Sequence, residues 1–452
     1  GDTPSIKRLE SHITINKPAK STSFVYFMFA RSCCGAGLLS FVSTVVRAQL
    51  YLHIPSVYPK PTIPSGFVPI KHHPIAQQST RSSVEIKTTA ASRKIKTPQK
   101  MAAWFEEVFG FPESRNFDLV RSSFRLEEND TVLVALPPRG GGMRRFHIGP
   151  FGTPSVKELR TELNNLDRTV SELGTLNFSH IIGSADDLHL DPANEGSVFQ
   201  AASQFNCLEM VNPKVKPTDG ITGYIYDGTQ GPSCAIACPA ATVYRNYLVN
   251  GGVGQAVQQI DTLKDIGDIL GNVEIVDGKQ KNRYWKMQNG YALPARRFAI
   301  EKLREEIESG DVNLEAAMES VRVGLHMDTE VFDASSTTRP QHRVAQVYCS
   351  AVPVGYDYST KPRDWEPFAK LVLDATYDAT LAAGAILSRK HQKRIKVFLT
   401  KVGGGVFRND SEWIISAIRK ALIRYRSYPL DVYLVHFRNL EGDYVHSLKE
   451  IK

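Results

Sequence analysis

The stretch FLTKVGGGVFRN, Phe398 to Asn409, passes from an apolar strand pattern into three glycines, and a helical pattern follows from Trp413 to Leu422. Glycines let backbone N–H groups approach an anion closely, and the unpaired N–H groups at the start of a helix favour negative charge. We therefore expect a strand, a phosphate-binding loop and a helix. The ligand-binding candidates are Gly403, Gly404, Gly405, Val406, Phe407 and Asn409. A simple tight turn is the alternative interpretation.

The glycine loop matches neither of two common nucleotide-binding motifs, because no Lys-Ser/Thr pair follows it and GGGVF lacks the GxGxxG pattern. A second glycine-rich segment, DGTQGPS at 227–233, precedes an apolar helical pattern. Pro232 suits a first helical turn, and the hydroxyl of Thr229 or Ser233 can cap that helix or bind phosphate oxygens. The segment predicts a second anion-binding loop that faces the first, formed by Gly228, Thr229, Gln230, Gly231 and Ser233.

The positive charge of the chain is concentrated at its start. The 452 residues carry a formal net charge of +8, yet residues 1–100 contain 14 Lys and Arg against 3 Asp and Glu. The remaining residues therefore hold 41 basic and 44 acidic side chains. A near-neutral remainder argues against general nucleic-acid binding by the folded part, which would need a basic surface.

Residues 1–100 are rich in Ser, Thr, Pro and basic side chains, and we expect a disordered or targeting-like basic tail. Its apolar block at 24–46 is interrupted by Arg31 and is too short and broken for a membrane span. An upstream extension or a fragment is the alternative to a targeting leader. The six cysteines lie mostly in apolar runs, which is typical of buried thiols in a reducing, intracellular compartment. The spacing of Cys234 and Cys238 does not predict a metal site.

Strand-like and helix-like segments alternate after the tail. Residues 101–175 predict a helix and hairpin extension packed on the core, and residues 176–452 predict an α/β domain. Strand patterns include HIIGS, SVFQAAS, GYIYD, RVGLHM, VAQVYCSAVPV, KVFLTKV and DVYLVHF. Helical patterns cover 156–173, 235–247, 294–308, 365–387 and 412–425. This order predicts a layered fold with its ligand at the carboxyl ends of the strands.

Polar side chains follow three of the predicted strands. Asp186 and Asp187 follow HIIGS, where a carboxylate can accept from an adenine amino group or a ribose hydroxyl. Gln204 and Asn206 follow SVFQAAS, and their amides suit sugar hydroxyls. Asp219 and Asp227 flank GYIYD. Turn or helix capping is the alternative role for each aspartate.

Together, the strand-Gly-x-x-Asp order, the strand followed by Asn, the helix-opening glycine loop and the late GGGVF loop resemble a macrodomain, the ADP-ribose-binding module. The GGGVFRND loop is most similar to the diphosphate loop of poly(ADP-ribose) glycohydrolase-type and bacterial-effector macrodomains. The resemblance covers about residues 180–440. It implies an α/β/α sandwich with a mixed central sheet, Asp186 or Asp187 near adenine, Asn206 near the distal ribose, and both glycine loops around the diphosphate, with Phe407 stacked on the distal ribose.

One departure concerns the catalytic acid. The Gln-Glu-Glu that follows the first glycine loop in the glycohydrolases is absent, because that position reads TQGPSCAIA. Asp219 and Asp227 are the nearest substitutes, since a carboxylate can activate water or stabilise an oxocarbenium-like state. The resemblance implies a hydrolase that removes ADP-ribose from a modified macromolecule, with Asn206 positioning the ribose and no metal or cofactor required. The alternatives are a non-catalytic ADP-ribose or nucleotide-diphosphate binding module, another nucleotide-sugar-processing enzyme, or an interaction scaffold.

Overall fold

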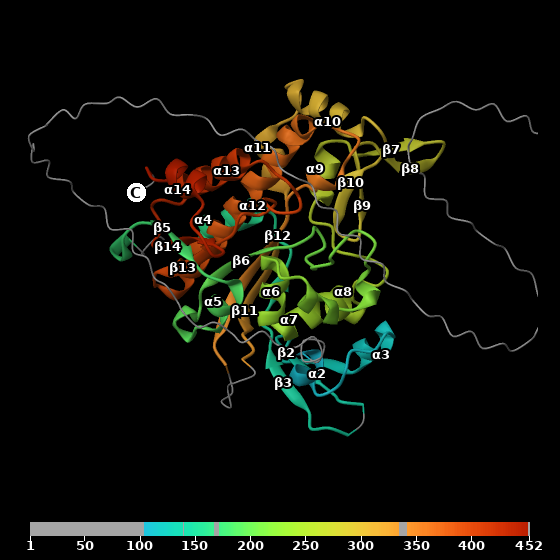
Figure 1. Ribbon diagram of the computed structural model, residues 1–452, viewed down its shortest axis with the longest axis vertical. Helices are drawn as coiled ribbons and strands as arrows, with labels where there is room; N and C mark the ends of the chain where they lie inside the picture. Colours follow the sequence, from blue (N-terminus) through green and yellow to red (C-terminus); the bar gives the residue numbers. More distant parts are fainter. Residues whose placement is uncertain (1–103, 139, 167–170, 334–340, 451–452) are drawn as a thin grey trace, which may run out of the picture. The chain divides into compact units, whose positions relative to one another are not determined.

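A seven-stranded mixed sheet lies at the centre of the computed structural model, which describes residues 104–138, 140–166, 171–333 and 341–450 (Figure 1). The predicted basic tail at 1–100 lies outside the described residues. The strand order is β4-β11-β12-β6-β13-β14-β5. In that order, the strands are Phe151–Gly152, Gly324–Glu330, Arg343–Cys349, Val198–Ala202, Ile395–Leu399, Leu430–His436 and Asn177–Ile182.

Five adjacent strands of this sheet are parallel. β12 pairs in parallel with β6, β6 with β13, β13 with β14, and β14 with β5, whereas β11 is antiparallel to both β12 and β4. Parallel strands place their carboxyl ends at one edge of a sheet, where α/β proteins bind ligands. The predicted α/β class with a mixed central sheet is confirmed.

Helices cover both faces of the sheet, because successive strand residues point to opposite sides. Val397 packs in the core under one helical layer, whereas its neighbour Phe398 packs in a separate cluster under the other. The first layer contains α4 (Val156–Asn165), α9 (Lys264–Ile269), α10 (Ala299–Glu308), α11 (Leu314–Ser320), α12 (Pro362–His391) and α13 (Ser411–Arg424). The second contains α5 (Ala185–Leu190) and α7 (Pro239–Val243), which contribute to the Phe398 cluster, and α6 (Gln230–Ala237), which contacts α5 and β6.

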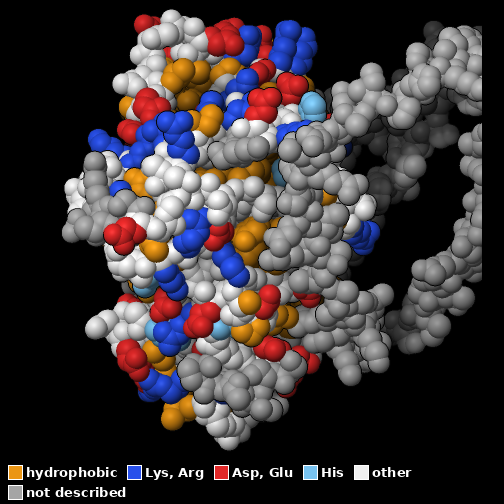
Figure 2. Space-filling view, turned by 90° about the vertical axis from the view of Figure 1, so that its left-hand side faces the viewer, with side chains coloured by type: hydrophobic (Ala, Val, Ile, Leu, Met, Phe, Trp, Pro, Cys, Tyr) orange, Lys and Arg blue, Asp and Glu red, His pale blue; other side chains and the backbone are white. Residues whose placement is uncertain are grey.

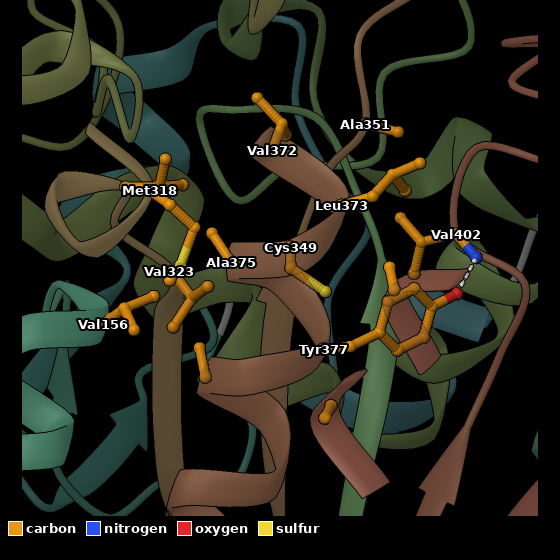
Figure 3. Packing of buried hydrophobic residues seen from close by; sticks show 14 of the residues in the cluster. Val156, Met318, Val323, Cys349, Ala351, Val372, Leu373, Ala375, Tyr377 and Val402 are labelled. Atoms are coloured by element: carbon orange, nitrogen blue, oxygen red, sulfur yellow. Dashed lines mark hydrogen bonds between the residues drawn. The ribbon is translucent and has the colours of Figure 1, made fainter. Parts of the chain in front are cut away.

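The 30-residue helix α12 is the centre of the larger core. Gly384 lets it approach the sheet, since a Cβ there would lie 2.8 Å from Cγ2 of Val397. Figure 3 shows its Tyr377 directed toward the backbone nitrogen of Val402. The Tyr377 hydroxyl accepts from Val402 N–H at 3.1 Å and donates to the Thr400 carbonyl at 2.8 Å. A buried helix thus holds the chain on entry to the glycine loop.

The first described residues form a smaller unit at the lower end of Figure 1. It contains α2 (Trp104–Phe109), α3 (Phe117–Ser122) and a three-stranded sheet of β1 (Phe124–Glu127), β2 (Val132–Ala135) and β3 (Arg144–His147). Its aromatic core is shared with α7 and the π-helical turn Tyr244–Leu248. Glu113 joins the two parts, because its carboxylate accepts from the N–H groups of Ile221 and Thr222 and from the hydroxyl of Tyr247.

Local structure differs from the sequence patterns at several places. GYIYD was expected as a strand, but Thr222–Tyr226 is a 3-10 turn held by the Glu113 carboxylate, with Tyr224 buried. The helix expected at 235–247 is divided by Pro239, which cannot continue the hydrogen-bonded ladder of α6. Small elements complete the chain: α8 (Val249–Gly252), the hairpins β7 (Val273–Val276) with β8 (Lys279–Asn282) and β9 (Trp285–Gln288) with β10 (Tyr291–Pro294), and α14 (Gly442–Ser447).

The surface intermixes charges of both signs, as Figure 2 shows for one face. Among the described residues, α12 alone has the length and composition of a membrane-spanning helix. Its most apolar window is 94% buried inside the fold. That burial is the property of a core helix.

We predict that Tyr377→Phe lowers the free energy of unfolding by roughly 1–3 kcal/mol, because the Val402 N–H and the Thr400 carbonyl lose a buried partner. Urea denaturation of the two proteins measures the change. Tyr428→Phe is the control, since that half-exposed hydroxyl lies 3.4 Å from an Arg389 nitrogen at the margin of hydrogen bonding. Equal stability of the Tyr377 variant and wild type would show that these two hydrogen bonds do not stabilise the loop.

Candidate ligand-binding site

A pocket of about 490 Å³ opens at the carboxyl ends of β6, β12 and β13. This volume lies within the range of roughly 300–1,000 Å³ found for small-molecule sites. The walls come from four segments: residues 202–211, 226–232, the side chains of Tyr291 and Tyr356, and residues 400–407 together with Ala351. Both predicted glycine loops therefore contribute to one cavity, on opposite sides of the end of β6.

The glycine loop at residues 403–405 is a tight turn, and several backbone N–H groups in and after it have no hydrogen-bond acceptor among the described residues. Gly403 has φ +79°, and a Cβ there would lie 2.5 Å from that of Ala351. The N–H of Gly404 donates to the Lys401 carbonyl and that of Arg408 to the Gly405 carbonyl. In the described part of the chain, the N–H groups of residues 405–407 find no acceptor. Three consecutive free amides beside a pocket are suited to an anion.

Asn409 holds this loop from behind. Its Nδ2 donates to the Val352 carbonyl at 2.8 Å, its backbone N–H donates to the Gly403 carbonyl at 2.9 Å, and its side chain is buried. Gly404 faces the protein rather than the cavity, because a Cβ there would lie 3.2 Å from Ile414 Cδ1. Gly405, by contrast, has open space around its missing Cβ. Asn409 and Gly404 therefore shape the loop, whereas Gly405 to Phe407 present it to the pocket.

The first turn of α6 forms the opposite side. Gln230 joins it to β6, since its side-chain amide donates to the Gln200 carbonyl at 2.7 Å and accepts from Ala202 N–H at 2.9 Å. Gly231 is packed against the same strand, and a Cβ there would lie 1.8 Å from the Ala202 carbonyl oxygen. Thr229 precedes the helix without a side-chain capping bond. Pro232 has no N–H, and Ser233 N–H donates to the Thr229 carbonyl. Among the described residues, the N–H groups of this first turn without an acceptor are therefore those of Gln230 and Gly231, both of which line the pocket.

Two carboxylates line the pocket beside α6. Asp227 is half-buried, and its Oδ1 accepts from Thr229 N–H at 3.0 Å. Glu209 is 3% exposed, and its Oε1 has no hydrogen-bond partner among the described residues. Burial raises the pKa of Glu209 well above its usual value; the guanidinium of Arg245 opposes that rise and Asp227 adds to it. One pocket thus combines a half-buried carboxyl group with a buried one that favours its neutral form.

The remaining wall is aromatic. Tyr291, Tyr356 and Phe407 pack with ring centroids 5.2 to 5.6 Å apart. The Tyr291 hydroxyl donates to the Met210 carbonyl at 2.6 Å, and burial raises its pKa. Tyr291 begins β10, so residues 250–290, which carry no recognisable motif, lead into a wall of the pocket. Tyr226 and Val406 are 63% and 64% exposed at its mouth.

Several predicted site residues lie elsewhere. Asn206 is fully buried and bonds Gln259 and the Leu208 N–H. Asp219 accepts from the Lys216 N–H and borders a different hollow beside Glu113. Asp186 and Asp187 occupy the first turn of α5, where Asp187 accepts from the Ser184 hydroxyl. Ser233 is also absent from the pocket lining. Gln204 does line the pocket, but its side-chain oxygen already accepts a hydrogen bond from the Met210 N–H.

The sequence patterns missed Glu209, Tyr226, Tyr291, Tyr356 and Lys401, all of which line the pocket. Glu209 did carry a signal, because it is a single acid within the apolar run CLEMV, and buried carboxyls without a partner cation are uncommon. The four described cysteines are free and buried. Burial raises the pKa of the Cys207 thiol to about 12, so this group is unsuited to nucleophilic chemistry.

Comparisons with known proteins give matches among solved structures only. No protein-family model and no curated protein matches the chain. The chain is similar to a poly(ADP-ribose) glycohydrolase from Thermomonospora curvata, with 12% identity, a TM-score of 0.35, and coverage of 78% of this chain and 99% of that one. It is also similar to the Deinococcus radiodurans glycohydrolase solved with ADP-ribose, with 11% identity, a TM-score of 0.34, and coverage of 75% and 100%.

We predict that Gly231→Ala lowers the free energy of unfolding by on the order of 3 kcal/mol, because its Cβ would overlap the Ala202 carbonyl and the Glu209 carboxyl. Gly228→Ala is the matched control, since nothing lies within 4 Å of its added Cβ. The control should stay within about 0.5 kcal/mol of wild type in urea denaturation. If both variants unfold alike, the close approach of α6 to β6 is wrong.

Proposed function

We propose that the pocket binds ADP-ribose and that the protein is an ADP-ribosyl hydrolase, which releases ADP-ribose from a modified macromolecule. One observation carries the proposal: two turns with free backbone amides line a single cavity at the carboxyl ends of parallel strands, and a carboxylate, Asp227, lines it at the start of one of them. A diphosphate is the group that two such turns would hold together. The GGGVF resemblance to the diphosphate loop of macrodomains points to the same ligand.

The loops would share the diphosphate. The free N–H groups of residues 405–407 supply donors from one side, and the first turn of α6 supplies donors and the positive end of a dipole from the other. Lys401 lines the pocket but forms an ion pair with Glu441. The negative charge of the diphosphate would therefore be stabilised mainly by backbone N–H groups. Binding should therefore require the loop geometry more than any single cation.

The aromatic wall would receive the sugar. Phe407 is the last residue of the amide loop and packs against the rings of Tyr291 and Tyr356, and a ribose face can pack against this aromatic group. Asp227 stands on the opposite wall, at the start of the other loop. Its Oδ1 is fixed by the Thr229 N–H, and its Oδ2 accepts no hydrogen bond within the described residues. This oxygen is available to orient a water or a ribose hydroxyl at the anomeric carbon.

A binding module without turnover is the second candidate. It is favoured by the placement of Asn206 and Asp219 outside the cavity, because two of the three predicted catalytic side chains then have structural roles. It is also compatible with Asp227 acting as a turn-forming residue. Incubation of the full chain with an ADP-ribosylated protein separates the candidates, since only a hydrolase releases free ADP-ribose.

We predict that Gly405→Asp weakens ADP-ribose binding at least tenfold, about 1.4 kcal/mol, because it places a negative charge beside the diphosphate in space that is open. Gly405→Asn has nearly the same size without the charge and is the matched control, expected to bind several times more tightly than the Asp variant. Calorimetric titration of the full chain measures both. Equal affinities of the two variants would argue against a diphosphate at this loop, and absence of binding by wild type would overturn the proposal.

A further inference from the structure

Glu209 is the group in the pocket whose environment the binding scheme leaves unexplained. It follows β6 by seven residues, is 97% buried and belongs to the pocket lining. Its Oε1 is buried and has no hydrogen-bond partner among the described residues. A buried carboxylate normally has a cation or several N–H donors around it. A neutral carboxyl with a proton to donate needs neither.

The position of Glu209 is fixed by its neighbours. Its backbone N–H donates to the Tyr224 hydroxyl at 2.9 Å, which ties it to the 3-10 turn before Asp227. Its Oε2 lies 2.4 Å from where a Cβ of Gly231 would stand, so the carboxyl occupies the angle between α6 and the end of β6. The charged and titratable groups that interact electrostatically with it are Asp227, Arg245, Tyr224, Tyr291, Tyr348, Cys207, Cys234 and Cys349.

The guanidinium of Arg245, which acts on Glu209, forms its hydrogen bonds with other groups. Arg245 donates from Nε to the Cys207 carbonyl at 3.1 Å and from Nη2 to the Thr242 hydroxyl at 3.0 Å. Its Nη1 lies 3.2 Å from His326 Nδ1, and its guanidinium covers the Tyr348 ring at 3.6 Å. Arg245 therefore lowers the free energy of ionising Glu209 without forming an ion pair with it. That is a suitable environment for a carboxyl that gives up a proton and later recovers it.

We propose that Glu209 is the proton donor to the leaving group in the hydrolysis that this pocket carries out, with Asp227 as the partner carboxylate. The inference rests on the proposed function. As the C–O bond at the anomeric carbon breaks, its electron pair stays on the leaving oxygen, which takes the proton of Glu209. Water attacks the anomeric carbon and gives a proton to Asp227, and transfer of that proton through solvent to Glu209 restores both carboxyl groups. One water is consumed, and ADP-ribose and an alcohol are formed.

This assignment selects a substrate class. A serine-type alkoxide is a poor leaving group and needs a proton as it departs, whereas a carboxylate leaves readily without one. A pocket that buries a carboxyl acid next to a second carboxylate is therefore built for ether-type linkages to hydroxyl side chains. Ester linkages to acidic side chains would gain little from Glu209.

The test compares Glu209→Gln with wild type, as full chains, on one peptide ADP-ribosylated through serine and one through glutamate. We expect kcat/KM to fall about 10²- to 10⁴-fold on the serine substrate and less than about tenfold on the glutamate ester. The Kd for ADP-ribose should change less than about threefold. Glu330→Gln is the control, because Glu330 is also buried but accepts from the His147 N–H outside the pocket.

An independent readout is the pH profile of wild type. Burial raises the pKa of Glu209, so the donor form persists above the usual range of a glutamate and kcat/KM on the serine substrate falls as pH rises through the raised pKa. For the ester substrate, kcat/KM should not show this fall with rising pH. Equal losses on both substrates, or an unchanged rate in Glu209→Gln, would overturn the proton-donor role while ADP-ribose binding stands. No binding of ADP-ribose by wild type would overturn the proposed function itself.

Discussion

The contact between Gly231 and the end of β6 is the constraint on which the pocket depends. Only a residue without a Cβ lets the start of α6 lie against the Ala202 carbonyl. The Gln230 side chain adds two hydrogen bonds to the strand backbone at the same place. This approach brings the loop that carries Asp227 beside Glu209 and places Gln230 and Gly231, the first residues of the helix, in the pocket wall. A displacement of α6 by one methyl radius would separate these groups.

The opposite loop is held by a different mechanism. α12 reaches through the core to the strand ends, where the Tyr377 hydroxyl bonds on both sides of Lys401. Gln200 of β6 accepts from the Thr400 N–H and donates to Thr380 of α12, so strand, helix and loop share one buried polar network. Such networks fix a loop more strongly than packing alone, because each broken bond leaves a buried polar group unpaired. The two halves of the pocket are thereby positioned before any ligand arrives.

Much of this arrangement was predictable from local patterns. The alternation of strands and helices indicated a layered α/β fold, and the glycines at 403–405 indicated a turn after a strand, where the structure places them after β13. The glycines at 228–231 open a helix as expected, but a 3-10 turn and not a strand precedes them. Individual side chains were harder to place. Asn206 follows a core strand as expected, yet it turns away from the cavity because the chain folds back and Gln259 meets it. Tyr291 enters the pocket from a hairpin far along the sequence, and no local pattern encodes that contact.

A crystal structure of the full chain grown with ADP-ribose tests most directly whether the amides of residues 405–407 and the first turn of α6 hold one diphosphate between them. We expect both phosphates in the pocket, with oxygens within hydrogen-bond distance of those two sets of N–H groups, and the distal ribose between Phe407 and Asp227. ADP-ribose bound with its diphosphate away from either loop, or at another part of the surface, would rule out this arrangement.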